Sequence, residues 1–215
     1  MFIVSSLLDI FLHLDQHLSL YMNEYGPFIY LILFIIVFCE TGLVIMPFLP
    51  GDSLLFATGA LAAAGSIKLL PIYLIFCLAA IAGDTVNYAI GHYLRDKVAA
   101  REKIRFIKKE YLDRTTEFFK KHGSATIILA RFVPIIRTFA PFVAGVGSMP
   151  YRKFLSFNAI GGILWVSIAL FAGYFFGNIP VVKDNFSIVV LGIVVVSLLP
   201  VVFTIIKNKI TAKNL

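Results

Sequence analysis

The chain has 215 residues, of which 60% are hydrophobic and only 14% charged, and its mean hydropathy is +0.91. Soluble domains carry about a quarter charged residues, so this composition excludes an ordinary water-soluble fold. The net charge of +7 comes with no base-reading motif, which argues against nucleic-acid binding. The sequence therefore predicts an all-α polytopic membrane protein with a single domain.

The first predicted element is an amphipathic helix over residues 1–24. Polar residues at Ser6, Asp9, His13 and His17 recur at helical spacing, with phenylalanine and leucine opposite them. This pattern is typical of a helix that lies on the membrane surface. The two histidines are spaced as in some metal sites, but no third or fourth ligand accompanies them. We therefore predict no metal site and no cofactor.

Two apolar stretches, residues 27–65 and 123–150, are interrupted by residues that stop helices. Irregular backbone survives at membrane depth only where it is buried in protein or lines a wet cavity. Each stretch is therefore predicted to be a re-entrant hairpin, which enters and leaves the bilayer on one side. The returning half-helices should begin near Ser53 and Phe142. The hairpin-breaking residues are Pro47, Pro50 and Gly51 in the first hairpin and Pro134 and Pro141 in the second.

Three further apolar runs, residues 70–94, 154–177 and 187–207, are long enough to span a bilayer. Ten of the 19 basic residues lie in a predicted helix over 95–122, and no Lys or Arg precedes Lys68. Positively charged loops stay in the cytoplasm. This bias predicts that 95–122 and the C-terminus are cytoplasmic and that the N-terminus lies on the outer, periplasmic side.

A weak internal repeat relates the two hairpins. Gly65-Ser66 and Gly147-Ser148 are 82 residues apart, and so are Gly91 and Gly173. Because one span separates the hairpins, the two copies would have opposite orientations in the membrane. Such inverted repeats are typical of secondary transporters, whose broken helices place the binding site near the midplane.

Ionisable residues within the apolar sequence are the functional candidates, because each costs about 2.5–3.5 kcal/mol to insert. They are Glu40, Asp52, Asp84, Arg131 and Arg137. Two acids lie on the first hairpin and both arginines on the second, so we predict one polar cavity between the hairpins. Arginine offers planar, two-pronged donors and half-helix N-termini offer N–H groups, which together suit a phosphate. The alternative is two buried salt bridges that only fix the hairpins to each other.

The acids add a second property to this cavity. A carboxylate with little water around it can exchange a proton during a transport cycle, so Glu40 and Asp52 are predicted to couple transport to protons. Two interpretations of Asp84 stay open. With Gly83, Asn87 and Tyr88 on one helix, it either lines the same cavity or satisfies broken backbone.

These residues resemble the pattern of the bacterial DedA family, which is related to eukaryotic VTT (SNARE-associated) domain proteins. The resemblance extends over residues 26–177 and is carried by Glu40, Pro50-Gly-Asp-Ser53, Gly83-Asp84 with Asn87-Tyr88 and Gly91, and Arg131-Phe-Val-Pro-Ile-Ile-Arg137. It implies an inner-membrane lipid transporter with two opposed re-entrant loops. Bacterial members are implicated in returning undecaprenyl phosphate to the cytoplasmic leaflet, with dependence on the proton-motive force, and eukaryotic relatives scramble phospholipids. The family's two acids match Glu40 and Asp52, and its two arginines match Arg131 and Arg137.

We therefore predict a non-enzymatic flippase for undecaprenyl phosphate, whose partners are membrane lipids and protons, with a homo-oligomer left open. The alternatives are a broader phospholipid scramblase and a proton-coupled exchanger of small cations. The exchanger would leave the paired arginines without a role. An intramembrane phosphatase would need a nucleophile, a base or a metal site, and no hydrolase motif surrounds the four histidines.

Overall fold

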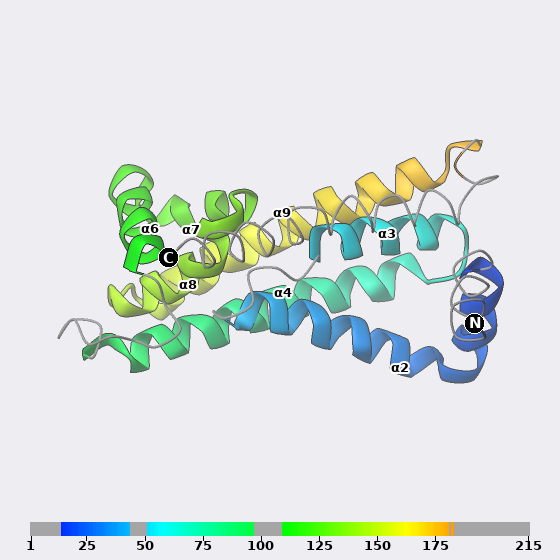
Figure 1. The fold of residues 1–215 in the computed structure, drawn as a ribbon, viewed down its shortest axis with the longest axis horizontal. Coiled ribbons are helices and arrows are strands. Elements are labelled where there is room, and N and C mark those ends of the chain that lie inside the picture. Colours follow the sequence, from blue (N-terminus) through cyan, green and yellow to red (C-terminus); the bar gives the residue numbers. More distant parts are fainter. Residues whose placement is uncertain (1–13, 44–50, 97–108, 181, 183–215) are drawn as a thin grey trace, which may run out of the picture. The chain divides into compact units, whose positions relative to one another are not determined.

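The computed structural model describes residues 14–43, 51–96, 109–180 and 182, and every regular element in these ranges is a helix (Figure 1). The chain forms two compact units. The first unit consists of 1–29, 50–72 and 169–215, and the second unit of 30–49 and 73–168. In chain order the elements are α2 (Leu14–Gly42), α3 (Gly51–Ala63), α4 (Leu69–Tyr93), α6 (Lys109–His122), η1 (Gly123–Ala125), α7 (Thr126–Leu129), η2 (Ala130–Phe132), α8 (Pro134–Val146) and α9 (Tyr151–Gly177).

Two helices of the described residues, α4 and α9, are long and apolar enough to cross a bilayer. They correspond to the predicted spans 70–94 and 154–177. The helices α3 and α8 have 13 residues each, which is too short to span. The predicted span 187–207 lies outside the described residues, as do Pro47, Pro50 and residues 97–108 of the predicted basic helix.

Two proline positions differ from the sequence prediction. The boundary expected between residues 24 and 27 is absent, because α2 continues through Pro27 to Gly42. Likewise, Pro141 lies inside α8 and does not break the hairpin. A proline removes one backbone N–H, yet membrane helices tolerate this loss where the freed carbonyl finds other partners. The number of prolines in an apolar stretch therefore overestimates the number of helix ends.

The second hairpin breaks one residue before Pro134 instead. Val133 is extended, with φ −118° and ψ 107°, and α8 begins at Pro134. The ring of a proline clashes with a helical residue before it, so the preceding residue leaves the helical conformation. The half-helix predicted to start near Phe142 therefore starts eight residues earlier.

In the first unit, α3 packs on α9 through a glycine-mediated crossing. A Cβ atom on Gly59 would lie 2.8 Å from the backbone nitrogen of Tyr174, and one on Gly173 would lie 2.7 Å from the carbonyl carbon of Phe56. Both distances are shorter than real Cβ contacts, so only glycine permits this approach. The rings of Phe56 and Phe176 lie beside the crossing with centroids 5.5 Å apart.

In the second unit, α8 packs on α4 in the same manner. A Cβ atom on Gly145 would lie 2.7 Å from the backbone nitrogen of His92, and one on Gly91 would lie 2.9 Å from the carbonyl carbon of Phe142. Gly59 of α3 meets Tyr174, and Gly145 of α8 meets His92. The two residues met, His92 and Tyr174, are 82 residues apart, which is also the spacing between Gly91 and Gly173. Each unit thus contains a close glycine-mediated helix crossing, and the repeat that would relate the two crossings stays a prediction. The opposite orientation of the two copies stays a prediction.

The amphipathic helix α6 packs against α8 within the second unit (Figure 1). Its apolar side chains lie against α8 and its neighbours: Leu112 contacts the pair Phe139 and Phe142, and Phe119 contacts a cluster that includes Phe154. Its polar face, including Lys120, is exposed. Phe139 and Phe142 of α8 are therefore packed against side chains of both α6 and α4.

Candidate functional site

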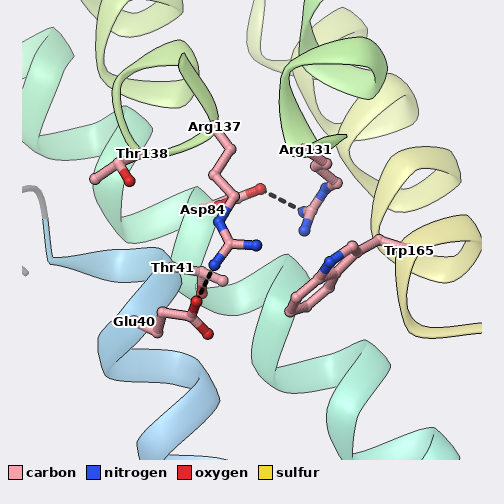
Figure 2. Close-up of a pocket in the computed structure, with 7 residues that line it drawn as sticks. All are labelled: Glu40, Thr41, Asp84, Arg131, Arg137, Thr138 and Trp165. Carbon is pink, nitrogen blue, oxygen red and sulfur yellow. Dashed lines mark hydrogen bonds and ion pairs between the residues drawn. The ribbon is translucent and has the colours of Figure 1, made fainter. Parts of the chain in front are cut away.

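Two ion pairs lie in one pocket of the second unit (Figure 2). A guanidinium nitrogen of Arg137 on α8 donates to Glu40 on α2, and one of Arg131 on η2 donates to Asp84 on α4. Glu40, Asp84 and Arg131 are 4%, 5% and 6% exposed, whereas the Arg137 side chain is 18% exposed. The pocket is lined by Glu40, Thr41, Asp84, Arg131, Arg137, Thr138 and Trp165, all from the second unit.

The chain break at Val133 allows both arginines to reach this pocket. Residues six apart on a continuous α-helix point roughly 240° apart around its axis. Arg131 and Arg137 instead belong to two short helices, η2 and α8, that meet at an extended residue. Both guanidinium groups consequently extend toward Trp165 (Figure 2).

The carboxylates are brought together by a close crossing of α2 and α4. A Cβ atom on Gly83 would lie 2.8 Å from the carbonyl oxygen of Phe38, and one on Gly42 would lie 3.2 Å from the carbonyl oxygen of Gly83. The two backbones therefore touch within two residues of the acids, which sets Glu40 and Asp84 at the same level of the second unit.

This crossing leads to a stability prediction. Gly83→Ala should lower the free energy of unfolding by about 1–3 kcal/mol, because the added methyl group must push the α2 backbone away. The change is measured as the denaturation midpoint of the purified protein in detergent. Ala89→Val, on the exposed face of the same helix, is the matched control and should have little effect. Equal stability of Gly83→Ala and the unchanged protein would contradict the crossing.

Trp165 is the single tryptophan of the chain and is 4% exposed. The guanidinium carbons of Arg131 and Arg137 lie 5.8 and 5.5 Å from its ring centroid. Both distances are within the range of cation–π attraction. The ring thus forms an apolar side of the pocket, and its π electrons attract the two guanidinium charges. Sequence reasoning missed Trp165, although a tryptophan in the middle of a span, away from the interfaces where this residue is enriched, was an available signal.

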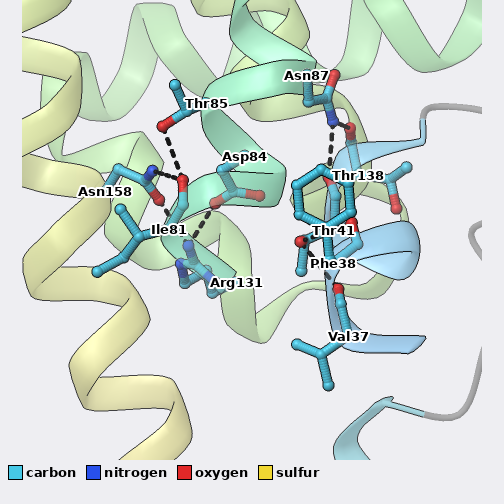
Figure 3. Close-up of polar contacts among 10 residues, drawn as sticks. All are labelled: Val37, Phe38, Thr41, Ile81, Asp84, Thr85, Asn87, Arg131, Thr138 and Asn158. Atoms are coloured by element: carbon cyan, nitrogen blue, oxygen red, sulfur yellow. Dashed lines mark hydrogen bonds and ion pairs between the residues drawn. The ribbon is translucent and has the colours of Figure 1, made fainter. Parts of the chain in front are cut away.

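Arg131 is held by more than its carboxylate (Figure 3). The side-chain oxygen of Asn158 on α9 accepts a hydrogen bond from Arg131 at 2.6 Å, and the Asn158 amide donates to the carbonyl oxygen of Ile81 at 3.0 Å. The guanidinium lies against glycines: a Cβ atom on Gly161 would be 3.3 Å from Nε of Arg131, and one on Gly162 would be 3.4 Å from Nη2. Sequence reasoning missed these residues, because neutral side chains in a span carry no charge signal.

Asn87 joins two helix segments beside the pocket. Its buried amide donates to the carbonyl oxygen of Thr41 at 3.1 Å and to that of Thr138 at 2.9 Å (Figure 3). Thr41 lies in the last turn of α2, where carbonyls have no partner within the helix. The sequence left open whether Asp84 lines the cavity or satisfies backbone groups, and in the structure different residues of α4 do these two things. Asp84 lines the cavity, and Asn87 donates to backbone carbonyl oxygens of α2 and α8.

The remaining predicted site residues have different positions. Asp52 lies in the first turn of α3, in the first unit, and is exposed. Gly51 is the first residue of that helix, and Pro134 is the first residue of α8. The pocket therefore contains Glu40, Asp84 and both arginines, but Asp52 is not among its lining residues. Within the described ranges, no group of three or more His, Cys, Asp or Glu residues is arranged to hold a metal ion.

Comparisons with known proteins identify the family of the chain. A VTT-domain family profile matches residues 49–175. Protein DedA of Escherichia coli K12 is 52% identical over 205 residues, which cover 94% of each chain. An uncharacterized membrane protein of Mycobacterium leprae is 45% identical over 166 residues, 77% of this chain and 74% of its own. The inner membrane protein YghB of Escherichia coli K12 is 34% identical over 188 residues, 84% of this chain and 86% of its own. No solved structure matches the chain.

The matched domain covers more than half of the chain, and it contains the two arginines and Asp84. The relatives are membrane proteins by name or carry the family name itself. Together with two apolar spans and a charged pocket between apolar helices, these matches establish that the chain is a bacterial membrane protein and belongs to the DedA family.

Proposed function

We propose that this protein is a lipid transporter that moves undecaprenyl phosphate across the cytoplasmic membrane and uses the proton-motive force. The single observation that carries the proposal is the pocket of the second unit, in which two arginines and two carboxylates lie together around Trp165. Charged groups buried in apolar helices are costly and are kept where they contact a substrate or an ion.

Phosphate is the anion that best suits the arginines. A guanidinium donates two parallel hydrogen bonds that match two phosphate oxygens, and it keeps its charge at any physiological pH. The ring of Trp165 gives the pocket an apolar side, which suits the first methylene groups of an isoprenoid chain. A phosphate headgroup and an apolar tail are the two parts of undecaprenyl phosphate.

The proton coupling is assigned to Glu40 and Asp52. Glu40 lies next to Arg137 in the pocket, so an arriving anion and the carboxylate compete for one cation. Asp52 is exposed in the first turn of α3, where the positive end of the helix dipole stabilises a negative charge. Each carboxylate can take up a proton from one side of the membrane and release it to the other side during a transport cycle.

Reconstituted transport tests this function directly. Full-length protein in proteoliposomes is supplied with labelled undecaprenyl phosphate, and its movement between leaflets is measured with and without an imposed proton gradient. We expect the movement to depend on the protein and to accelerate when the gradient is applied. Phosphatidylglycerol in place of the carrier lipid distinguishes a broad scramblase, which would move both lipids at similar rates without a gradient.

A proton-coupled cation exchanger is the second candidate, because the pocket holds two carboxylates. In this pocket each carboxylate is already paired with an arginine, so a cation would have to displace a guanidinium. The same proteoliposomes, loaded with a pH-sensitive dye and given a sodium or potassium gradient, test it. Cation-driven proton flux without lipid movement would favour the exchanger over the flippase.

The proposed topology gives a separate prediction, in which the N-terminus is periplasmic and the C-terminus is cytoplasmic. It rests on the absence of Lys and Arg before Lys68. In a background without Cys39 and Cys77, Ser5→Cys should react with an impermeant thiol reagent added to intact cells, and Ala212→Cys should react only after permeabilisation. Labelling of both positions from the same side would contradict the arrangement.

A further inference from the structure

The two arginines of the pocket have unequal surroundings. Arg131 is 6% exposed, donates to both Asp84 and Asn158, and lies flat against Gly161 and Gly162. The Arg137 side chain is three times as exposed, at 18%, and its guanidinium pairs with Glu40. Moving Arg131 would break two buried hydrogen bonds and its packing against the two glycines, whereas the ion pair of Glu40 and Arg137 lies at the more exposed side of the pocket.

The size of the cavity adds to this asymmetry. It has a volume of about 10 Å³, room for about one water molecule. A phosphate headgroup is much larger than one water molecule, so it cannot enter while all four charged side chains keep their positions. One of the two carboxylates has to leave its arginine before the headgroup can bind.

We propose that Glu40 is the carboxylate that leaves, and that the two arginines therefore have different roles. Asn158 and Asp84 fix Arg131 as a wall of the pocket, and Arg137 alone exchanges Glu40 for the phosphate. This division of roles rests on the proposed function. Asn158 is accordingly a positioning residue that acts through Arg131 and does not touch the lipid.

The balance of charge specifies what happens to Glu40. Before exchange, Arg137 and Glu40 neutralise each other, as do Arg131 and Asp84. A phosphate ester with one negative charge can replace the Glu40 carboxylate on Arg137, but it leaves that carboxylate charged and buried. An uncompensated buried charge is strongly unfavourable. Glu40 therefore takes one proton from water when the phosphate binds, both arginines stay protonated, and the pocket stays neutral.

The groups around Glu40 support this assignment. The charged side chains that line the pocket with it are Arg137 of α8, Asp84 of α4 and Arg131 of η2, and α9 contributes the neutral ring of Trp165. Of the two acids, Asp84 belongs to the pair that Asn158 and the glycines fix. Glu40 is the acid whose partner is already partly exposed.

Two measurements on the full-length protein in detergent test the proposal without transport. The fluorescence of Trp165, the single tryptophan, reports the binding of decyl phosphate, and a pH-indicator dye in weakly buffered solution counts the protons taken up per ligand. Glu40→Gln should bind decyl phosphate about tenfold more tightly, because it removes the competing charge that keeps the binding state rare. It should also take up about one proton less per ligand than the unchanged protein.

Asn158→Ala is the matched comparison, because it loosens Arg131 without touching Glu40 and leaves the charge of the pocket unchanged. Folded Asn158→Ala should keep the proton uptake of the unchanged protein and should melt at a lower temperature. Where this variant does not fold, Asn158→Ser takes its place, because it also leaves the charge unchanged and keeps a small polar side chain.

The outcomes separate this inference from the proposed function. Equal proton uptake by Glu40→Gln and the unchanged protein, or weaker phosphate binding by Glu40→Gln, would overturn the exchange at Arg137. Loss of the proton uptake in the folded Asn158 variant would overturn the fixed role of Arg131. If decyl phosphate does not bind to the unchanged protein, then the phosphate-transport function itself is wrong, and the exchange is wrong with it.

Discussion

Asp84→Leu is expected to lower the free energy of unfolding by about 3–5 kcal/mol, the largest stability loss among the substitutions considered. The reason is that Arg131 is 6% exposed and keeps its charge when its carboxylate partner is removed. Asn158 supplies a neutral oxygen only. The loss is measured by denaturant unfolding of the purified protein, followed by Trp165 fluorescence.

A double replacement separates stability from function at this pair. Asp84→Leu combined with Arg131→Met removes both charges and should recover most of the lost stability, since apolar side chains of similar volume often replace a buried ion pair well. It should still transport poorly, because one wall of the phosphate pocket has changed. Asp113→Leu, at an exposed acid of α6, is the control. A double variant no more stable than Asp84→Leu would mean that the cost lies in packing rather than in the stranded charge.

The second large effect is expected at Arg137. Arg137→Lys should reduce the transport of undecaprenyl phosphate in proteoliposomes by at least about tenfold while the protein stays folded. Lysine keeps the positive charge but loses the planar, two-pronged donor that matches two phosphate oxygens. Arg131→Lys should also impair transport, with a larger loss of stability, because the guanidinium of Arg131 is buried against Asn158 and two glycines.

Arg152→Lys, at an exposed arginine near the start of α9, is the matched control and should transport at the normal rate. Melting temperature and yield are measured beside the flux, so that a folding defect is not mistaken for a transport defect. A folded Arg137→Lys protein with unchanged transport and unchanged affinity for the lipid phosphate would remove the clamp from the proposed mechanism.

The charged members of the site could be predicted because charge in apolar sequence is conspicuous. Glu40, Arg131 and Arg137 share one pocket, as the sequence indicates. Which acid pairs with which arginine could not be predicted, since that depends on how α2, α4 and α8 cross. Asp52 illustrates the limit: it resembles the other acids in sequence, yet it is exposed on α3 in the first unit.

The neutral members of the site carried too weak a signal to be found. Asn158 and the Gly161-Gly162 pair lie in an apolar run that a hydropathy argument treats as lipid-facing span. Their role appears only when the guanidinium of Arg131 is seen against them. Pro141 shows the opposite error, because it is predicted to break the second hairpin but lies inside α8.

The small cavity between the ion pairs also bears on electrical insulation. Proton leakage through a protein requires a continuous file of water molecules or exchangeable groups, and the pocket has room for about one water molecule. Both carboxylates that could relay a proton are held by guanidinium groups. In the ligand-free state the second unit therefore opposes proton conduction at this level, so that many copies of the protein in one membrane would not by themselves dissipate its potential.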